Sequence, residues 1–279
     1  MKITLLGTGT SCGVPVIGCT CEVCQSTDPK DHRLRCSILV ETDTTRLLVD
    51  CGPDFRQQIL PQSFRRVDGI LVTHSHYDHV GGMDDIRPYC QFGQINVYAD
   101  ANACKEMLQL LPYCFAENRY PGVPKIELNE IKAGCSFQIG DVDILPVRVM
   151  HGNMPILGYR FGRFAYVTDM KTIEDCQAGL LEGVDTLVVN ALRFDRPHHS
   201  HQLVDDAVDF ARRVGARRTL LTHLCHDIGL FDKATARLPK GIELAYDNQV
   251  LEISNDGICS TDCRSCASVC EASSHHRKL

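Results

Sequence analysis

The stretch His74-Ser75-His76-Tyr77-Asp78-His79 decides which fold and which chemistry this chain can adopt. It directly follows the apolar run Gly69-Ile70-Leu71-Val72-Thr73, which is typical of a buried strand. Several imidazoles and a carboxylate therefore stand on a loop with a rigid base, and these groups are ligands of zinc, manganese and iron. The order of the residues predicts that His74 and His76 bind one ion, while Asp78 and His79 bind a second ion close by.

Length and composition favour a single large domain. The chain has 279 residues, of which 44% are hydrophobic, enough for a substantial core. No Pro- or Ser-rich linker and no repeat divides it, so we predict one domain over residues 1–254. Residues 255–279 are rich in Ser, Asp and Cys, and we expect a disordered tail there. The tail carries cysteines that could instead bind zinc or an iron–sulfur cluster: Cys259, Cys263, Cys266 and Cys270.

The sequence also indicates where the protein works. No segment approaches the roughly 20 apolar residues of a membrane span, and the apolar run at the N-terminus is too short for a signal peptide. We therefore expect a cytoplasmic protein with no membrane partner. The 16 cysteines are then better interpreted as thiols or metal ligands than as disulfides. A net charge of −6 argues against an extended nucleic-acid groove.

Hydrophobic patterns predict a mixed α/β chain. Early strands occur in pairs joined by short turns, such as Thr42-Asp43-Thr44-Thr45, and later strands alternate with helices. This order favours two packed sheets with helices outside. The predicted strands are residues 3–7, 37–42, 46–50, 69–73, 95–99, 143–150, 158–161, 165–168, 186–190, 219–222, 242–245 and 250–253. The clearest predicted helices are residues 101–111, 173–181 and 202–214.

Three further metal-binding side chains follow predicted strands. They are His151, Asp169 and His223, and each would be carried inward by its strand. If they converge on the first cluster, Asp169 can bridge two cations and neutralise the charge between them. The predicted ligand set is then His74, His76 and His151 for one ion, and Asp78, His79 and His223 for the other.

A cluster of cysteines predicts a separate structural zinc site. Cys19, Cys21 and Cys24 lie within six residues, and three thiolates need only one more ligand to complete a tetrahedral zinc site. The residues alone leave several choices for the fourth ligand: Cys12, Cys36, Cys225 and His226.

Together these motifs resemble the metallo-β-lactamase-fold hydrolases, and among them the PhnP-type phosphodiesterases, which open 5-phosphoribosyl 1,2-cyclic phosphate. The resemblance covers residues 1–253. It implies an αββα sandwich with a dimetal site at one edge, and it points to His226 as the fourth zinc ligand. The segments that carry it are Gly7-Thr8-Gly9-Thr10-Ser11-Cys12-Gly13-Val14-Pro15, Gly18-Cys19-Thr20-Cys21-Glu22-Val23-Cys24, Asp50-Cys51-Gly52, the stretch from His74 to His79, Thr168-Asp169 and Thr222-His223-Leu224-Cys225-His226.

Hydrolysis of a phosphodiester at such a site needs a nucleophile and a proton donor. Two ions roughly 3.5–4 Å apart can hold a hydroxide, and we predict that Asp78 takes part in catalysis as one of their ligands. The resemblance places a catalytic histidine near His201, which we predict to be the proton donor; His198 and His199 are alternatives. Arg87 could bind a substrate phosphate, although its position is equally consistent with a salt bridge on a helix surface.

The function predicted from the sequence is hydrolysis of a small phosphodiester such as 5-phosphoribosyl 1,2-cyclic phosphate. The predicted cofactors are two catalytic Zn or Mn ions and one structural Zn. Two alternatives stay open: a redox protein of cofactor biosynthesis that resembles PqqB, which has a similar Cys-x-Cys-x-x-Cys loop, and a metal-binding protein without turnover. The sequence does not decide whether the chain forms a homodimer, as its relatives do.

Overall fold

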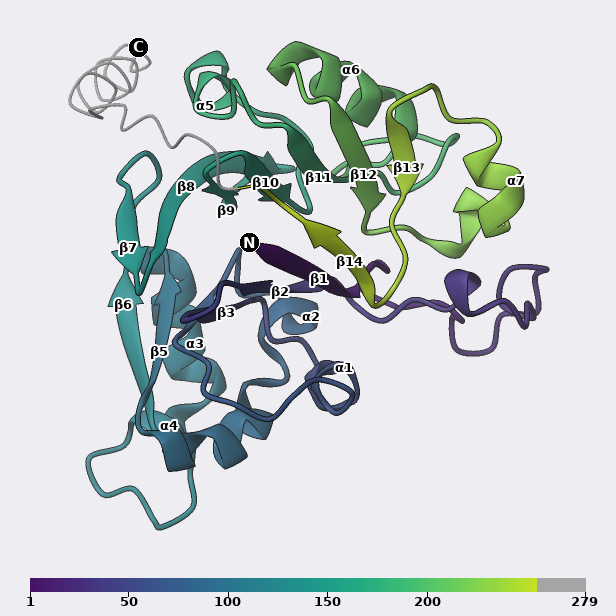
Figure 1. Cartoon of the computed structure of the whole chain (residues 1–279). Coiled ribbons are helices and arrows are strands. Elements are labelled where there is room, and N and C mark those ends of the chain that lie inside the picture. Colours follow the sequence, from purple (N-terminus) through teal and green to yellow (C-terminus); the bar gives the residue numbers. More distant parts are fainter. Residues whose placement is uncertain (255–279) are drawn as a thin grey trace, which may run out of the picture.

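Two seven-stranded sheets pack face to face in the computed structural model, which describes residues 1–254 (Figure 1). The first sheet has the order β14-β1-β2-β3-β4-β5-β6 and the second the order β13-β12-β11-β10-β9-β8-β7. The strands of the first sheet are β1 (Lys2–Gly7), β2 (Ser37–Glu41), β3 (Arg46–Val49), β4 (Gly69–Leu71), β5 (Ile95–Ala99), β6 (Ile126–Glu130) and β14 (Gln249–Glu252). Those of the second are β7 (Phe137–Ile139), β8 (Val142–His151), β9 (Met154–Phe161), β10 (Phe164–Val167), β11 (Thr186–Asn190), β12 (Arg218–Thr222) and β13 (Ile242–Leu244).

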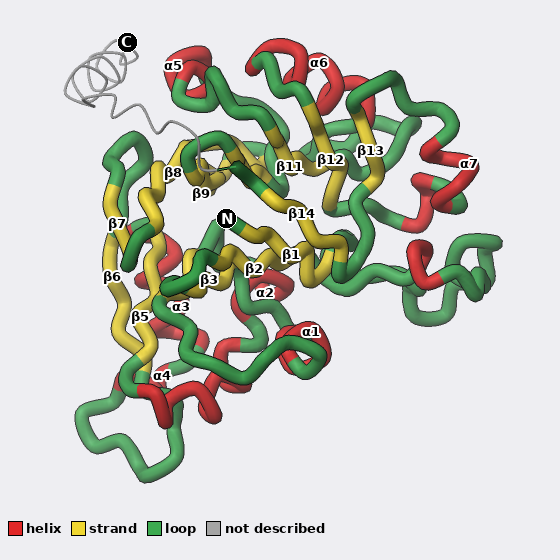
Figure 2. Tube along the Cα trace, in the orientation of Figure 1, coloured by secondary structure: helices red, strands yellow, loops and turns green. Residues whose placement is uncertain are grey.

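Helices cover the outer face of each sheet, as Figure 2 shows in red. The first sheet is covered by α1 (Phe55–Ile59), α2 (Tyr77–Val80), α3 (Ala101–Leu110), α4 (Pro112–Phe115) and the 3₁₀ helix η2 (Met83–Phe92). The second is covered by α5 (Asp175–Gly179), α6 (Val204–Val214) and α7 (Phe231–Thr235). Two short 3₁₀ helices lie in loops, η1 (Pro29–Asp31) and η3 (His226–Ile228). The predicted αββα sandwich is confirmed.

The core forms three apolar layers. The layer between the sheets contains fully buried side chains such as Ile38, Leu47, Tyr159 and Phe164, and each such side chain contributes about 1.5–3 kcal/mol when it is removed from water. The other two layers lie between each sheet and its helices. Strands β10 and β11 are buried at every position because both faces of the sheet are covered there.

Helix α6 illustrates how the sequence determines one of these layers. Val204, Ala207, Val208 and Ala211 recur at intervals of three or four residues and are buried against the second sheet. Gly215 ends the helix with a φ of 73°, a conformation that glycine adopts without steric cost. The amphipathic pattern therefore sets the face that the helix buries, and Gly215 sets where the helix ends.

The strands and helices differ from the sequence prediction mainly at the sheet edges. Strands β6 and β7 were not predicted, because β6 carries three polar residues among five and β7 has only three residues. Strand β9 begins at Met154, earlier than predicted, and α5 is shorter than the predicted helix. The turn Thr42–Thr45 joins β2 to β3 as an antiparallel pair, as predicted.

The remaining expectations concern the Cys-rich tail, membrane-crossing helices and the cysteines. The Cys-rich tail at residues 255–279 lies outside the described residues. Within residues 1–254, none of the helices combines the length and the apolar character that crossing a membrane requires. Within the same residues, the cysteines form no disulfide bond.

Candidate metal centre

The site is built where strands of both sheets end. Strands β3 and β4 run parallel, as do β10, β11 and β12, so their carboxyl ends lie on one edge of each sheet. Asp50, Asp169 and His223 lie within two residues of the ends of β3, β10 and β12 and have φ values of 61°, 57° and 56°. Positive φ costs about 1–3 kcal/mol in a residue other than glycine and is concentrated at functional sites. The backbone is therefore bent at the three points that turn these side chains inward.

Four predicted ligands form the centre of this site. Asp78, His79, Asp169 and His223 each offer a ligand atom, and these atoms all lie within 4.8 Å of one another. The Nε2 atom of His79 is 3.2 Å from Oδ2 of Asp78 and 3.3 Å from Oδ2 of Asp169. The other oxygen of Asp169, Oδ1, is 3.0 Å from Nε2 of His223. Asp169 thus lies between the two histidines and faces each with a different oxygen.

The environment of these atoms fits a divalent cation. Among the described residues, the Nε2 atoms of His79 and His223 are buried and make no hydrogen bond. A buried polar atom without a partner costs about 1–3 kcal/mol, and a native structure rarely leaves two of them side by side. Imidazole nitrogens and carboxylate oxygens that face a common point are the donors that zinc and manganese bind. The residues therefore suit a metal better than a hydrogen-bonded core.

The remaining predicted ligands line the adjoining wall. Nε2 of His74 lies 3.0 Å from Nδ1 of His76, and the His151 ring centroid is 5.6 Å and 5.2 Å from those of His74 and His76. Nδ1 of His151 donates to the backbone carbonyl of Asp169 at 2.8 Å, so its Nε2 is left as the acceptor nitrogen. The structure thus brings together all seven residues that the sequence analysis assigned to the two ions.

Asp50 is a residue of this site that the sequence prediction missed. Its carboxylate is fully buried, accepts a hydrogen bond of 2.7 Å from Nδ1 of His79, and also accepts from the backbone N and the hydroxyl of Thr73. Burial raises the pKa of Asp50. Although burial by itself lowers the pKa of His79, the carboxylates of Asp50 and Asp169 raise it well above its usual value. The hydrogen bond to Asp50 places the proton of the neutral ring on Nδ1, which leaves Nε2 as the nitrogen that faces the metal group. The signal in the sequence was an Asp directly after a strand, within Asp50-Cys51-Gly52.

A second set of buried side chains holds Asp169. The side-chain amide of Asn190 accepts from the backbone N of Met170 at 2.7 Å and donates to the carbonyl of Met170 at 2.9 Å. The Thr168 hydroxyl donates to Oδ2 of Asp169 at 2.7 Å. Burial opposes ionisation of Asp169, but the neighbouring His223 and His79 lower its pKa well below the usual range. Asp169 is therefore ionised and fixed in orientation.

Gly52 allows the Asp50 loop to lie directly against the metal loop. A Cβ at this position would be 2.0 Å from the backbone oxygen of Asp78, which is far inside van der Waals contact. The same contact is supported by the hydrogen bond from the backbone N of Cys51 to the carbonyl of His79 at 2.7 Å. Any side chain at position 52 would push the two loops apart.

Of the three histidines proposed as the proton donor, His201 lies against the metal group. His198 is bonded to Ser200, and the His199 side chain is exposed. The Nδ1 atom of His201 is buried 3.8 Å from Oδ1 of Asp169, and the His201 ring packs against those of His151 and His223. Burial, with a contribution from the neighbouring His223, lowers the pKa of His201 to about 3. A neutral ring suits a further metal ligand, and His151, Asp169 and His201 have ligand atoms within 4.8 Å of one another. A proton donor at this position needs a higher pKa, which the negative charge of a bound phosphate would favour.

Arg87 makes the surface salt bridge that was the alternative to phosphate binding. Its Nη2 and Nε donate to the carboxylate of Asp84 at 2.7 Å and 3.0 Å, and its Nη1 donates to the carbonyl of Gly122 at 3.0 Å. Tyr113 donates to the same carboxylate. These contacts tie Arg87 to η2 and to the loop around Gly122, and none of them favours a substrate phosphate.

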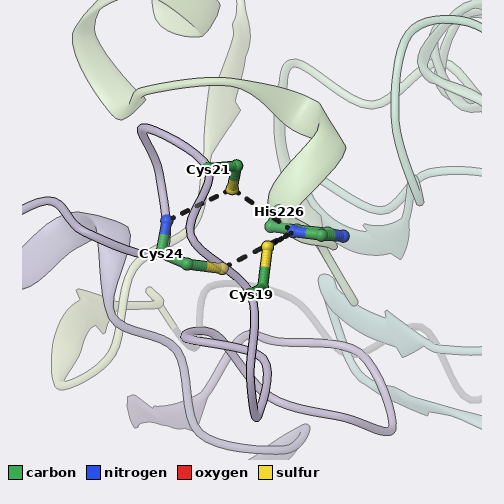
Figure 3. Close-up of side chains that lie close together, drawn as sticks. All are labelled: Cys19, Cys21, Cys24 and His226. Atoms are coloured by element: carbon green, nitrogen blue, oxygen red, sulfur yellow. Dashed lines mark hydrogen bonds between the residues drawn. The ribbon is translucent and has the colours of Figure 1, made fainter.

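The cysteine cluster forms a second site, shown in Figure 3. The sulfurs of Cys19, Cys21 and Cys24 lie 3.2 Å, 3.4 Å and 3.5 Å from Nδ1 of His226. The backbone N of Cys24 donates to the Cys21 sulfur and, with smaller contributions from neighbouring side chains, lowers the pKa of Cys21 to about 6. Three sulfurs and one imidazole nitrogen around a common point suit a tetrahedral zinc. Of the possible fourth ligands, His226 is the one that lies in this group.

Comparisons with known proteins agree with this architecture. Residues 45–224 match the model of the β-lactamase superfamily domain. The crystal structure of a new diphosphatase from the PhnP family superposes with a TM-score of 0.83 at 37% identity, covering 91% of this chain and 98% of that one. The Zn(2+)-bound PqqB from Methylobacterium extorquens shares the fold, with a TM-score of 0.70 at 19% identity, covering 91% of this chain and all of that one.

A curated relative is longer than this chain. An octanoyltransferase from Porphyromonas gingivalis is 42% identical over 259 residues, which are 92% of this chain but 53% of that protein. The chain spans about half the length of the first curated relatives that it matches. The match to the superfamily model covers more than half of the chain, and the PhnP-family structure is matched over nearly its whole length. The chain therefore has the metallo-β-lactamase fold and belongs, within the β-lactamase superfamily, to the PhnP family.

Proposed function

We propose that this protein is a dimetal hydrolase of small phosphodiesters, and that a cyclic phosphate such as 5-phosphoribosyl 1,2-cyclic phosphate is its substrate. The observation that carries the proposal is that Asp169 belongs to two groups of ligand atoms, one with Asp78, His79 and His223 and the other with His151 and His201. A carboxylate that faces two separate ligand groups suits a bridge between two ions.

The ligand set assigns each side chain a task. His74, His76 and His151 would hold one ion, Asp78, His79 and His223 the other, and Asp169 both. Two divalent cations bound there would lower the pKa of a water molecule and neutralise charge on phosphate oxygens. The protein contributes fixed positions, because His74, His79, Asp169 and His223 are almost fully buried and need no rearrangement as charge develops.

His201 is the proposed proton donor to the departing sugar oxygen. It lies beside Asp169, at the rim formed by the loop that connects β11 to α6. An alkoxide is a poor leaving group in water, and a positioned acid contributes about 10²–10⁴-fold to such reactions. The backbone carbonyl of His201 accepts a hydrogen bond from Nζ of Lys171 at 3.1 Å, which restrains the residue.

Diphosphate hydrolysis is a second candidate, because the 37% identical PhnP-family relative is described as a diphosphatase. Both reactions attack phosphorus, but they differ in the group that leaves. A phosphate leaves without protonation far more readily than an alkoxide does, so a diphosphate substrate depends less on His201. Comparing His201→Ala with wild type on both substrate classes therefore separates the two candidates.

Acyl transfer, the activity in the name of the octanoyltransferase relative, is not assigned to this chain. Nearly half of that protein lies outside the match, so its acyl transfer can belong to the part outside the match. An octanoyl thioester belongs in the substrate panel for this reason. Preferential hydrolysis of the thioester would replace the phosphodiester proposal.

The test is a hydrolysis screen with protein reconstituted with Zn or Mn. The panel contains bis(p-nitrophenyl) phosphate, ribose 1,2-cyclic phosphate, a dinucleoside diphosphate and the octanoyl thioester. We expect turnover of the phosphodiesters that is lost in Asp169→Asn, together with loss of bound metal measured by elemental analysis. Iron-dependent oxygen uptake without hydrolysis would favour the redox alternative related to PqqB. Tight metal binding without turnover of any compound would favour the non-catalytic alternative.

A further inference from the structure

The loop that carries His201 is anchored at both ends. The backbone N of Leu192 donates to the carbonyl of Gln202 at 2.9 Å, and the backbone N of Val204 donates to that of Arg193 at 3.1 Å. Residues 193–201 therefore form a loop whose two ends lie next to each other. The position of His201 depends on what holds the loop between these two anchors.

A carboxylate from another segment binds two arginines of the loop. Arg193 donates through Nη1 to Oδ2 of Asp227 at 3.3 Å, and Nη2 of Arg196 donates to the same oxygen. Nε of Arg193 donates to the carbonyl of Arg196 at 3.0 Å, which closes the turn. Arg196 has a φ of 63°, so its backbone conformation is costly and needs such contacts to persist.

The same carboxylate adjoins the thiolate site. Asp227 follows His226, whose Nδ1 faces the three cysteine sulfurs and whose other ring nitrogen points away from them (Figure 3). This Nε2 lies 4.0 Å from Oδ1 of Asp227. The neighbouring backbone adds a further link, because the N of Cys225 donates to the carbonyl of Leu192 at 3.0 Å. At 4.0 Å, Nε2 of His226 and Oδ1 of Asp227 do not form a hydrogen bond, so the link between Asp227 and His226 is chiefly the backbone that they share in η3.

We propose that Asp227 is a positioning residue that couples the thiolate site to loop 193–201 and, through this loop, to His201. A ligand held by Cys19, Cys21, Cys24 and His226 fixes the backbone of η3, and Asp227 then holds both arginines of the loop. Loss of that ligand loosens η3 and the loop together. The occupancy of the thiolate site thus regulates the order of the active-site rim. The effect on turnover rests on the proposed function, whereas the effect on loop order does not.

The test compares Asp227→Ala with Asp209→Ala, which removes an exposed carboxylate paired with Arg212 on α6. Hydrogen exchange measured by mass spectrometry reports the order of peptides that cover residues 193–201. We expect exchange there to become about tenfold faster in Asp227→Ala and to stay unchanged in Asp209→Ala. Zinc release to a chelator should also become faster in Asp227→Ala, because coupling between two sites is reciprocal.

Kinetics then separate positioning from general destabilisation. With a phosphodiester that the wild type hydrolyses, we expect Asp227→Ala to lower kcat about tenfold with little change in KM, and Asp227→Glu to restore part of the loss. Arg196→Gln changes an exposed side chain, so it tests the same contact even if the Asp227 variant folds poorly. Cys21→Ser should speed exchange in the same peptides.

The outcomes distinguish the two proposals. If exchange in peptides 193–201 is the same in Asp227→Ala, Arg196→Gln and Asp209→Ala, the coupling is wrong, whatever the enzyme hydrolyses. If exchange rises as expected but the wild type hydrolyses no phosphodiester, the coupling stands and the proposed function is wrong.

Discussion

Asp50 accepts a 2.7 Å hydrogen bond from Nδ1 of His79, although 29 positions separate the two residues in the chain. The contact holds a proton on the nitrogen that faces away from the metal group. His79 therefore presents Nε2 to Asp78 and Asp169. Carboxylates behind metal-binding histidines set both the tautomer and the basicity of the ligand.

Replacing Asp50 by Asn should weaken metal binding. An Asn at this position can still accept a hydrogen bond but removes the charge that favours the proton on Nδ1. We expect the affinity for Zn or Mn at the dimetal site to fall about 10–100-fold, measured by calorimetric titration. Asp232→Asn, at an exposed position on α7, is the control. Equal affinities in the two variants would mean that Asp50 acts only in folding.

Replacing His201 by Ala should lower turnover while the metals stay bound. We expect kcat on a phosphodiester to fall about 10²–10⁴-fold, because the leaving oxygen loses its proton donor. His199→Ala changes an exposed histidine of the same loop and should retain activity. Elemental analysis measures the metal content of both variants. Loss of metal in His201→Ala would assign His201 as a ligand, and unchanged turnover would place the acid elsewhere.

Replacing Cys21 by Ser should remove the structural zinc. The alcohol is a poor substitute for a thiolate, so we expect the zinc content to fall by about one ion per chain. The comparison is Cys135→Ser, at an exposed cysteine outside the cluster. Identical zinc content in the two variants would show that this cluster does not hold a structural zinc.

Asp247 should make stability depend on pH. Burial raises the pKa of Asp247 to about 6, against hydrogen bonds from the backbone N of Leu34 and the hydroxyl of Thr8 that favour the charged form. Since the folded pKa exceeds the unfolded value of about 4, the folded protein binds the proton more tightly. The stabilisation from this group is therefore fully present below pH 4 and is lost as the pH rises through 6. Part of the side chain is exposed, and solvent screening reduces the effect to about 2 kcal/mol.

Urea unfolding of Asp247→Asn at several pH values measures this contribution. Between pH 4.5 and pH 7.5, the free energy of unfolding of the wild type should fall by about 2 kcal/mol more than that of the variant. Asp143→Asn, at an exposed position, should follow the wild type. Parallel curves for all three proteins would show that Asp247 does not control stability in this range.

The sequence predicted the interior of this fold better than its edges. Central strands such as β10 and β11 are continuous apolar runs, and apolar patterning indicates them directly. Of the outer strands, β13 and β14 were predicted, but β6 carries three polar residues among five and β7 has only three residues. The formation of β6 and β7 depends on a neighbouring strand rather than on their own composition, so local patterning could not indicate them.

The sequence by itself determined which residues can bind metal, because the ligand chemistry of His, Asp and Cys is fixed by residue type, and their places after apolar runs and in short clusters are local features. It could not determine how those residues are supported. Asp50 lies behind His79, Asn190 fixes the turn after Asp169, and Asp227 joins the His201 loop to His226, all through contacts between distant segments. Only the tertiary structure decided these partners, because a hydrogen bond or an ion pair depends on distances of a few tenths of an ångström, which the packing of the two sheets sets.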